Sequence, residues 1–231
     1  MAATRSEVNG APQIGVEAAY RIWSADYDRT PNALLALETR VLSARIGAID
    51  GLRIFDAGSG TGRWMAWAEE RGACVFGIDT CREMIIQAAQ KPRLTGRSVI
   101  ADVRRIPVRN DAADIAICSF TAGYLRSPYS LFLELARIAR RVIVSDLHPE
   151  AVHHGWTRSF RAAGRHYEVS HYEHSSEELD AAAGAASLKC EWRAEPYFDE
   201  PERHIFQAAG KERAFEHARR IRAVLITAWT R

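Results

Sequence analysis

In the 231-residue chain, residues 53–62 read Arg53-Ile54-Phe55-Asp56-Ala57-Gly58-Ser59-Gly60-Thr61-Gly62. This stretch is a short apolar run that ends in a carboxylate and three alternating glycines. A second run, Cys74-Val75-Phe76-Gly77-Ile78-Asp79, also ends in a carboxylate. Because glycine adopts positive φ and lets a ligand approach the backbone closely, the pattern predicts a strand, a tight turn, a helix and a parallel strand. An adenosine-bearing ligand is expected at the strand ends.

The glycine spacing discriminates between two kinds of adenosine cofactor. In the dinucleotide-binding turn the third glycine comes five positions after the first. Here that position is Arg63, and the third glycine comes one residue earlier. Asp56, at the tip of the strand, would repel a diphosphate and attract the ammonium group of a cofactor that carries an amino acid. The spacing therefore favours an adenosine cofactor that carries an amino acid, and a nicotinamide dinucleotide is the alternative.

The stretch from Asp56 to Gly62 resembles the first motif of the class I S-adenosylmethionine-dependent methyltransferases, and the resemblance continues in order from about residue 50 to 150. It implies that Asp79 holds both ribose hydroxyls and that Met84 lies against the adenine. It further implies that Asp102 accepts from the adenine amino group while the backbone of Val103 faces the ring. The remaining positions of the turn and its neighbouring loops that the resemblance assigns to S-adenosylmethionine are Gly58, Ser59, Gly60, Gly62, Thr80 and Ser119. Residues 80–83 are also predicted to form a capping box at the start of the next helix.

Apolar runs alternate with predicted helices along the chain, which is typical of a parallel sheet built from βαβ units. The runs lie at about 52–56, 74–78, 97–101, 114–119 and 141–146, and two more follow at 188–192 and 223–229. With the resemblance, they predict an α/β fold: a Rossmann-like, mostly parallel seven-stranded sheet with an antiparallel last strand and helices on both faces. The family usually has a Pro-Gly-Gly loop before the fifth strand. This chain lacks that loop, so a helix is expected to run almost directly into the strand.

Two segments are expected outside the sheet. Residues 1–48 are predicted to form an N-terminal helical lid, and residues 49–231 a methyltransferase core with a β-hairpin inserted at about 150–174. In similar small-molecule enzymes the N-terminal helices close over the cofactor, which implies cofactor contacts from Tyr20 and Tyr27. The alternative is that Tyr20 belongs to an apolar stripe that only faces the core.

The resemblance leaves the catalytic residue open. Methyl transfer from a sulfonium is an in-line displacement, and a general base is needed only when the acceptor atom carries a proton. His148 follows the fifth strand at the ligand-facing edge of the sheet and is one candidate; the alternative is that it caps backbone groups beside Pro149. His171 is a second candidate, from the hairpin. The histidines and cysteines lack the spacing of a metal site, so no metal is expected.

Composition sets broader limits. The formal charge of +2 gives no sign of a nucleic-acid or membrane partner. The four cysteines have neither metal-ligand nor disulfide spacing. The polar segment 1–12 is expected to be frayed. No apolar run is long enough to span a membrane. These features predict a soluble, cytoplasmic protein that is a monomer or a homodimer.

The chain lacks a motif that is typical of one class of methyl acceptor. Ser119-Phe120-Thr121-Ala122 stands where enzymes that methylate amino groups of DNA or protein glutamine carry a Pro-Pro-aromatic tetrapeptide. The sequence is instead similar to the small-molecule methyltransferases of ubiquinone, menaquinone and natural-product biosynthesis. We expect methyl transfer to an oxygen or nitrogen atom of a small metabolite. The alternatives are a non-catalytic module that binds S-adenosylmethionine and an NAD-dependent oxidoreductase.

Overall fold

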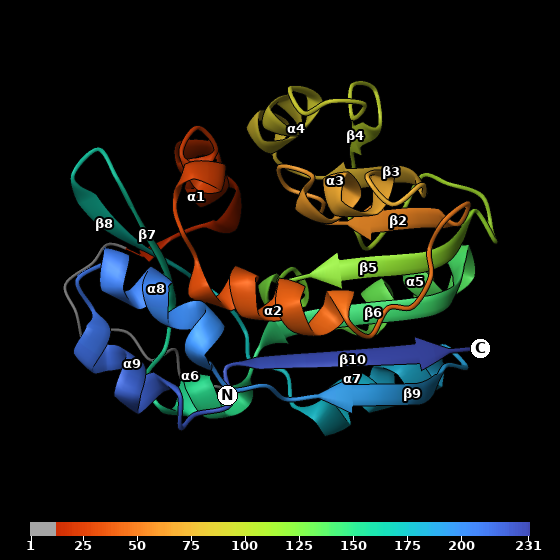
Figure 1. Ribbon diagram of the computed structural model, residues 1–231. Helices are drawn as coiled ribbons and strands as arrows, with labels where there is room; N and C mark the ends of the chain where they lie inside the picture. Colours follow the sequence, from red (N-terminus) through yellow and green to blue (C-terminus); the bar gives the residue numbers. More distant parts are fainter. Residues whose placement is uncertain (1–12) are drawn as a thin grey trace.

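A seven-stranded sheet runs through the centre of the computed structural model, which describes residues 13–231 (Figure 1). The predicted fraying of residues 1–12 lies outside the described residues. The order across the sheet is β4 (Ser98–Ile100), β3 (Cys74–Asp79), β2 (Arg53–Ala57), β5 (Ala113–Ser119), β6 (Ala139–Leu147), β10 (Val224–Thr230) and β9 (Lys189–Ala194). The strands from β4 to β6 are parallel, and β10 is antiparallel to both of its neighbours. The predicted Rossmann-like sheet with an antiparallel last strand is confirmed.

Helices cover both faces of this sheet, as predicted (Figure 1). One hydrophobic core packs α2 (Ala33–Ser43) and α3 (Arg63–Glu69) against one face. The other packs α5 (Tyr129–Ile138) and α7 (Ser176–Ala185) against the opposite face. Because the central strands are covered on both sides, their sequences are almost continuously apolar rather than alternating. The lack of a loop before β6 is also borne out, since α5 ends at Ile138 and β6 begins at the next residue.

A second, three-stranded sheet lies beside the first and joins both segments predicted outside it. The hairpin is formed by β7 (Arg158–Ala162) and β8 (Arg165–Val169), and the short strand β1 (Gln13–Ile14) pairs with β8. The helix that follows β1, α1 (Val16–Trp23), packs on the hairpin through Trp23, whose ring stacks on Phe160 with centroids 4.8 Å apart. We call β1, α1, β7 and β8 the cap.

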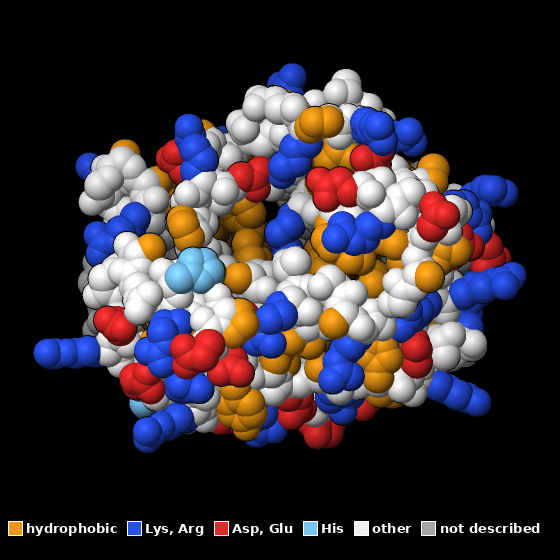
Figure 2. All heavy atoms as spheres, in the orientation of Figure 1, with side chains coloured by type: hydrophobic (Ala, Val, Ile, Leu, Met, Phe, Trp, Pro, Cys, Tyr) orange, Lys and Arg blue, Asp and Glu red, His pale blue; other side chains and the backbone are white. Residues whose placement is uncertain are grey.

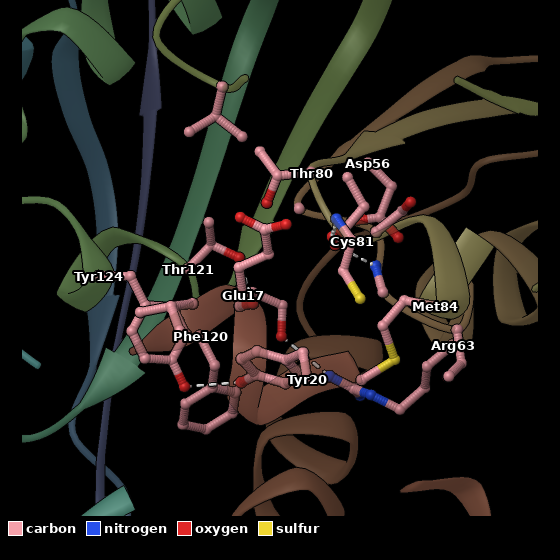
Figure 3. Close-up of a pocket in the computed structure, with 18 of the residues that line it drawn as sticks. Glu17, Tyr20, Asp56, Arg63, Thr80, Cys81, Met84, Phe120, Thr121 and Tyr124 are labelled. Atoms are coloured by element: carbon pink, nitrogen blue, oxygen red, sulfur yellow. Dashed lines mark hydrogen bonds between the residues drawn. The ribbon is translucent and has the colours of Figure 1, made fainter. Parts of the chain in front are cut away.

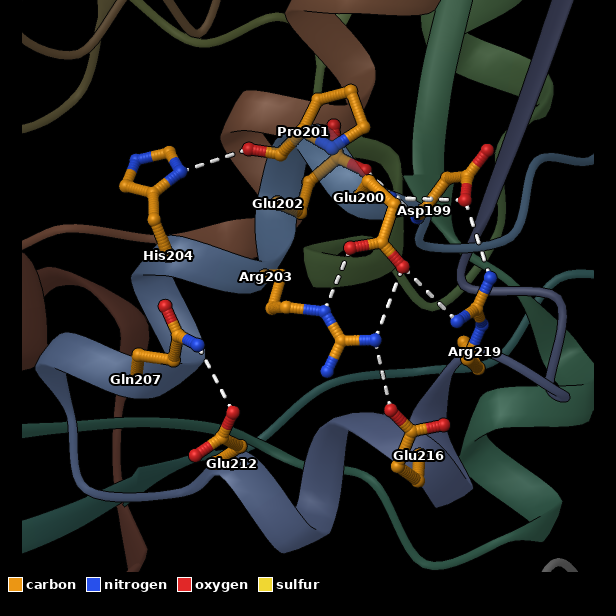
Figure 4. Close-up of polar contacts among 10 residues, drawn as sticks. All are labelled: Asp199, Glu200, Pro201, Glu202, Arg203, His204, Gln207, Glu212, Glu216 and Arg219. Carbon is orange, nitrogen blue, oxygen red and sulfur yellow. Dashed lines mark hydrogen bonds and ion pairs between the residues drawn. The ribbon is translucent and has the colours of Figure 1, made fainter.

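Two helices near the C-terminus were not predicted. They are α8 (Glu200–Ala208) and α9 (Glu212–Ala218), and Figure 4 shows the charged side chains that join them. Arg203 pairs with Glu200 at 2.7 Å on its own helix and with Glu216 at 2.9 Å on α9. The start of α8 has a capping box between Asp199 and Glu202, which is a sequence signal for a helix start that the prediction did not use.

The capping box predicted at residues 80–83 is wrong. The N-cap of α4 (Arg82–Ala89) is Cys81, and no side chain caps this helix start. Instead, the Asp79 carboxylate accepts from the backbone N–H of Cys81 at 2.8 Å, so the residue at the strand end takes over the role. Short elements complete the fold: the 3-10 turns η1 (Tyr27–Arg29) and η2 (Ala122–Tyr124), and the helix α6 (Pro149–His153). From residue 13 onward, no helix is long and apolar enough to cross a bilayer.

The stack of Trp23 on Phe160 predicts how the cap responds to mutation. Replacing Phe160 with alanine removes the main contact between α1 and the hairpin, so amide hydrogen exchange of residues 13–23 and 158–169 should become at least about tenfold faster. Exchange in β2 and β5 should stay unchanged. Phe206→Ala, in α8, is the matched control and should leave the cap protected. Equal protection of the cap in both variants would contradict this prediction.

Candidate functional site

A cavity of about 320 Å³ lies at the carboxyl ends of β2, β3 and β5, beneath α1. It is within the usual size range of small-molecule pockets, and Figure 2 shows a hollow on this side of the molecule. Of the thirteen predicted cofactor residues, twelve line it: Tyr20, Tyr27, Asp56, Gly58, Ser59, Gly60, Asp79, Thr80, Met84, Asp102, Val103 and Ser119. The residues predicted from the sequence therefore make up most of one wall of this cavity.

The glycine turn brings backbone to the cavity surface. Gly58 and Gly60 have φ of +77° and +54°, which favour glycine. A Cβ on Gly58 would also collide with the side chain of Thr121. Gly62 is the one predicted cofactor-binding residue that does not line the cavity: it is the N-cap of α3, and a Cβ there would lie 2.9 Å from Leu94. In this structure Gly62 provides close packing behind the turn.

Asp79 fixes the shape of the turn. One carboxylate oxygen accepts from the N–H of Gly60 and the other from the N–H of Cys81, both at 2.8 Å. Burial raises the pKa of this carboxyl group, and the backbone N–H groups oppose that rise. A carboxylate has about four acceptor positions, so two N–H donors leave capacity for ligand hydroxyl groups.

Asp56 and Ser59 are buried polar groups whose side chains have no hydrogen-bond partner within residues 13–231. Asp56 is 2% exposed, and its carboxylate makes no hydrogen bond among the described residues. Burial raises its pKa to about 7; Arg63 opposes the rise, while Asp79 and Glu38 add to it. The buried Ser59 hydroxyl has no partner within residues 13–231 either. Since buried polar groups are normally satisfied, the pair indicates a place for a cationic, hydrogen-bonding ligand group.

A buried ion pair lies beneath the cavity. Arg63, which lines it, donates to the fully buried carboxylate of Glu38 in α2 at 2.5 Å and to the hydroxyl of Ser119 at 2.9 Å. Glu38 also accepts from the Ser145 hydroxyl in β6 and from the Trp64 indole, the latter at 3.2 Å. The position at which a dinucleotide-binding turn has its third glycine is therefore an arginine that holds α2, α3 and two strands together.

The N-terminal segment covers the open side of the cavity. Asp28 in η1 accepts from the Thr61 hydroxyl at 2.6 Å and pairs with Lys91 at 2.6 Å. On α1, the Tyr20 hydroxyl is hydrogen-bonded to the hydroxyl of Tyr124 at 2.6 Å. Burial raises the pKa of Tyr20, so its phenol stays neutral. Tyr20 borders the cavity and also packs against the apolar cluster around Trp23, so its contact with the cofactor stays a prediction.

Asp102 is already paired at the adenine end predicted by the resemblance. Its carboxylate accepts from the Arg104 guanidinium at 2.5 Å, and that contact lowers its pKa. Both side chains border the cavity, and Met84 is fully buried at its wall.

Neither predicted catalytic histidine lines the cavity. His148 is the N-cap of α6: its Nδ1 accepts from the N–H of Glu150 at 3.0 Å, as the capping alternative predicted. The Nδ1 of His171 lies 3.3 Å from the carbonyl of Val169. Burial lowers the pKa of both rings, so both are neutral near pH 7. A catalytic role for either residue stays a prediction.

Two further parts of the cavity lining consist of residues that sequence reasoning did not select. One is Glu17 on α1 (Figure 3), and the other is a wall formed by Phe120, Thr121, Tyr124 and Leu125. Phe120 has φ of +50°, a strained value for a large side chain and common near functional sites. Behind this wall, Arg158 of the hairpin donates to the carbonyl of Phe120, pairs with the buried Asp146 and lies 4.5 Å from the ring centre of Tyr124. A strand-end carboxylate such as Asp146 is a weak signal, and nothing in the sequence connects it to Arg158. In the part of the chain that the structure describes, no cluster of histidine, cysteine and carboxylate side chains forms a metal site.

A family model described as a methyltransferase domain matches residues 55–142. Among curated proteins, the biotin biosynthesis bifunctional protein BioHC of Cellvibrio japonicus is 28% identical over 129 residues, 54% of this chain and 26% of that protein. Phosphatidylethanolamine N-methyltransferase of Cereibacter sphaeroides is 27% identical over 131 residues, 54% of this chain and 63% of that protein. The chain thus spans about a quarter of one relative and less than two thirds of the other.

Among solved structures, the chain is similar to an S-adenosylmethionine-dependent methyltransferase from Mesorhizobium loti. The TM-score is 0.65 at 22% identity, and the match covers 87% of this chain and 100% of that one. At this identity the likeness is one of fold.

The Glu38–Arg63 pair predicts a large stability effect. Arg63→Met leaves a fully buried carboxylate without its cation, which should lower the free energy of unfolding by about 3–5 kcal/mol. Adding Glu38→Gln should recover part of the loss. The matched control is Arg53→Met, whose partner Asp114 is partly exposed and which should change stability little. Urea unfolding measures all three variants, and equal effects of Arg63→Met and Arg53→Met would contradict the prediction.

Asp56 predicts a pH dependence of stability. Its pKa of about 7 in the folded protein lies above the 3.8 of an unperturbed aspartate, so between these values the folded protein holds a proton that the unfolded chain has lost. Without ligand, stability should therefore fall as pH rises from about 4 to about 7, by at most about 4 kcal/mol. Asp56→Asn should remove this contribution. A stability difference between the two proteins that stays constant over that range would exclude it.

Proposed function

We propose that the chain is a class I S-adenosylmethionine-dependent methyltransferase and that it transfers a methyl group from this cofactor to an oxygen or nitrogen atom of a small metabolite. One observation carries the proposal. Twelve residues predicted to contact the cofactor line a single cavity, in which the buried Ser59 hydroxyl has no hydrogen-bond partner within residues 13–231. One curated relative is named as an N-methyltransferase, which supports nitrogen as one of the two acceptor atoms.

The side chains present fit S-adenosylmethionine. The cofactor carries a sulfonium and an ammonium against one carboxylate, so it is cationic overall. Asp56 would accept from its ammonium group, and that contact would favour the ionised form of a carboxyl group whose pKa burial has raised. Asp79 would accept from the ribose hydroxyls with the acceptor positions that Gly60 and Cys81 leave open. Asp102 and Val103 would contact the adenine.

The bound cofactor would supply an activated methyl group with a neutral leaving group. The chain's own contribution is binding and orientation, which can lower a barrier by about 7–11 kcal/mol when the reacting atoms are held close together. The glycine turn allows close approach of the backbone, and the rigid contacts of Asp79 and Arg63 hold it in place. The N-terminal segment, proposed as a lid, closes the site through the Asp28 and Tyr20 contacts and excludes water.

The setting proposed for this reaction is the cytoplasm. The four cysteines are all free thiols, which supports a reducing compartment. The proposed acceptor is a small molecule rather than a nucleic acid, in agreement with the near-neutral formal charge of +2.

Isothermal titration with S-adenosylhomocysteine tests the cofactor site. We expect binding at micromolar concentration, and about 10–100-fold weaker binding by Asp79→Ala, because charged hydrogen bonds and the shape of the turn are both lost. Asp114→Ala is the control, since this residue lies at the opposite end of the sheet in a pair with Arg53. Absence of binding by the wild-type protein at high micromolar concentration would refute the proposal. Tight binding without turnover of any acceptor would favour the non-catalytic alternative.

A further inference from the structure

The cations around the cavity are paired with carboxylates. Arg63 pairs with Glu38, Arg104 with Asp102, and Arg158, behind the wall, with Asp146. Because each pair is close to neutral, none of these arginines offers a free positive charge to a ligand. An anionic group in the cavity would therefore find no unpaired cation among the residues that line it.

In contrast to these paired arginines, one carboxylate in the cavity lining, that of Glu17, is unpaired among the described residues. Glu17 extends from the first turn of α1 into the cavity (Figure 3) and makes no hydrogen bond or ion pair within residues 13–231. Its side chain borders the cavity and is exposed to solvent. Asp56 also lacks a partner, but it lies beside the glycine turn, where the proposed cofactor's ammonium would meet it. Glu17 comes from the cap and has no such role in the proposed cofactor site.

The cavity that Glu17 borders also has aromatic residues in its lining. Tyr20 lies one helical turn along α1, and Phe120 and Tyr124 lie on the facing wall. Aromatic rings attract cations through their negative faces, and a carboxylate beside them adds a direct ionic contact. Arg158 occupies one side of Tyr124, but its charge is balanced by Asp146. An unpaired carboxylate with aromatic neighbours suits a protonated amine, whereas it would repel a carboxylate or a phosphate.

We propose that the acceptor is a small aliphatic or arylalkyl amine, bound as its ammonium form by Glu17 against the aromatic wall of Tyr20, Phe120 and Tyr124. This rests on the proposed function and narrows its acceptor to nitrogen. For transfer, the ammonium first gives one proton to solvent at the cavity mouth. The nitrogen lone pair then forms the N–C bond while the electron pair of the C–S bond passes to sulfur, and the product leaves as the methylammonium.

Three ligands with the same aromatic body and different head groups test this inference. Phenethylamine, 2-phenylethanol and 3-phenylpropionate are titrated calorimetrically into the protein saturated with S-adenosylhomocysteine. We expect phenethylamine to bind at least about tenfold more tightly than 2-phenylethanol, and 3-phenylpropionate to bind most weakly.

Glu17→Gln should weaken phenethylamine binding about tenfold and leave the affinities for 2-phenylethanol and S-adenosylhomocysteine within about twofold. Glu177→Gln is the matched control, because Glu177 is also the second residue of its helix and does not line the cavity; it should change none of the affinities. The inference is overturned if phenethylamine does not bind, if either of the other ligands binds as tightly, or if Glu17→Gln leaves amine binding unchanged. It is also overturned if that variant weakens S-adenosylhomocysteine as much as the amine, because Glu17 would then serve the cofactor. If the wild-type protein does not bind S-adenosylhomocysteine at all, it is the proposed function that fails.

Discussion

The buried pair of Glu38 and Arg63 is the contact on which the arrangement of the site depends. Two charges removed from water destabilise a fold unless their remaining donors and acceptors are satisfied. Here Ser145, Trp64, Thr39 and Ser119 complete that set. The requirement fixes α2 against the start of α3 and the ends of β5 and β6. The glycine turn is thereby held at one height above the sheet, and the cavity has a rigid floor.

A second charged pair has a similar effect on the opposite wall. Asp146 lies at the end of β6, and its carboxylate accepts from the N–H of Gly123 as well as pairing with Arg158. Arg158 in turn holds the carbonyl of Phe120, a residue with strained backbone. The hairpin therefore sets the conformation of residues 120–124 although it belongs to a different sheet. Both walls of the cavity are positioned by buried charges rather than by apolar packing alone.

The sequence predicted the sheet and one wall of the site because those features are local. Gly58, Gly60 and Asp79 lie at the ends of apolar runs, and their chemistry follows from that placement. Contacts that depend on tertiary structure could not be predicted from the sequence. Arg158 pairs with Asp146 only because the hairpin folds back toward the main sheet. The capping role predicted for Thr80 failed because α4 has Cys81 as its N-cap, and the Asp79 carboxylate accepts from the N–H of that residue. The helices α8 and α9 were missed because their sequence is mostly polar, and their stability comes from contacts such as Arg40 with Glu202.

The cap has a consequence for how this architecture can be altered. Its two parts are separated by more than 130 residues of sequence, yet they share one small sheet through the pairing of β1 with β8 and one aromatic cluster around Trp23. Neither part is complete without the other, whereas the floor of the cavity belongs to the main sheet. Exchanging the caps of two such proteins would therefore require the N-terminal segment and the hairpin to be transplanted together. The cap is thus one structural unit whose two parts are far apart in the sequence.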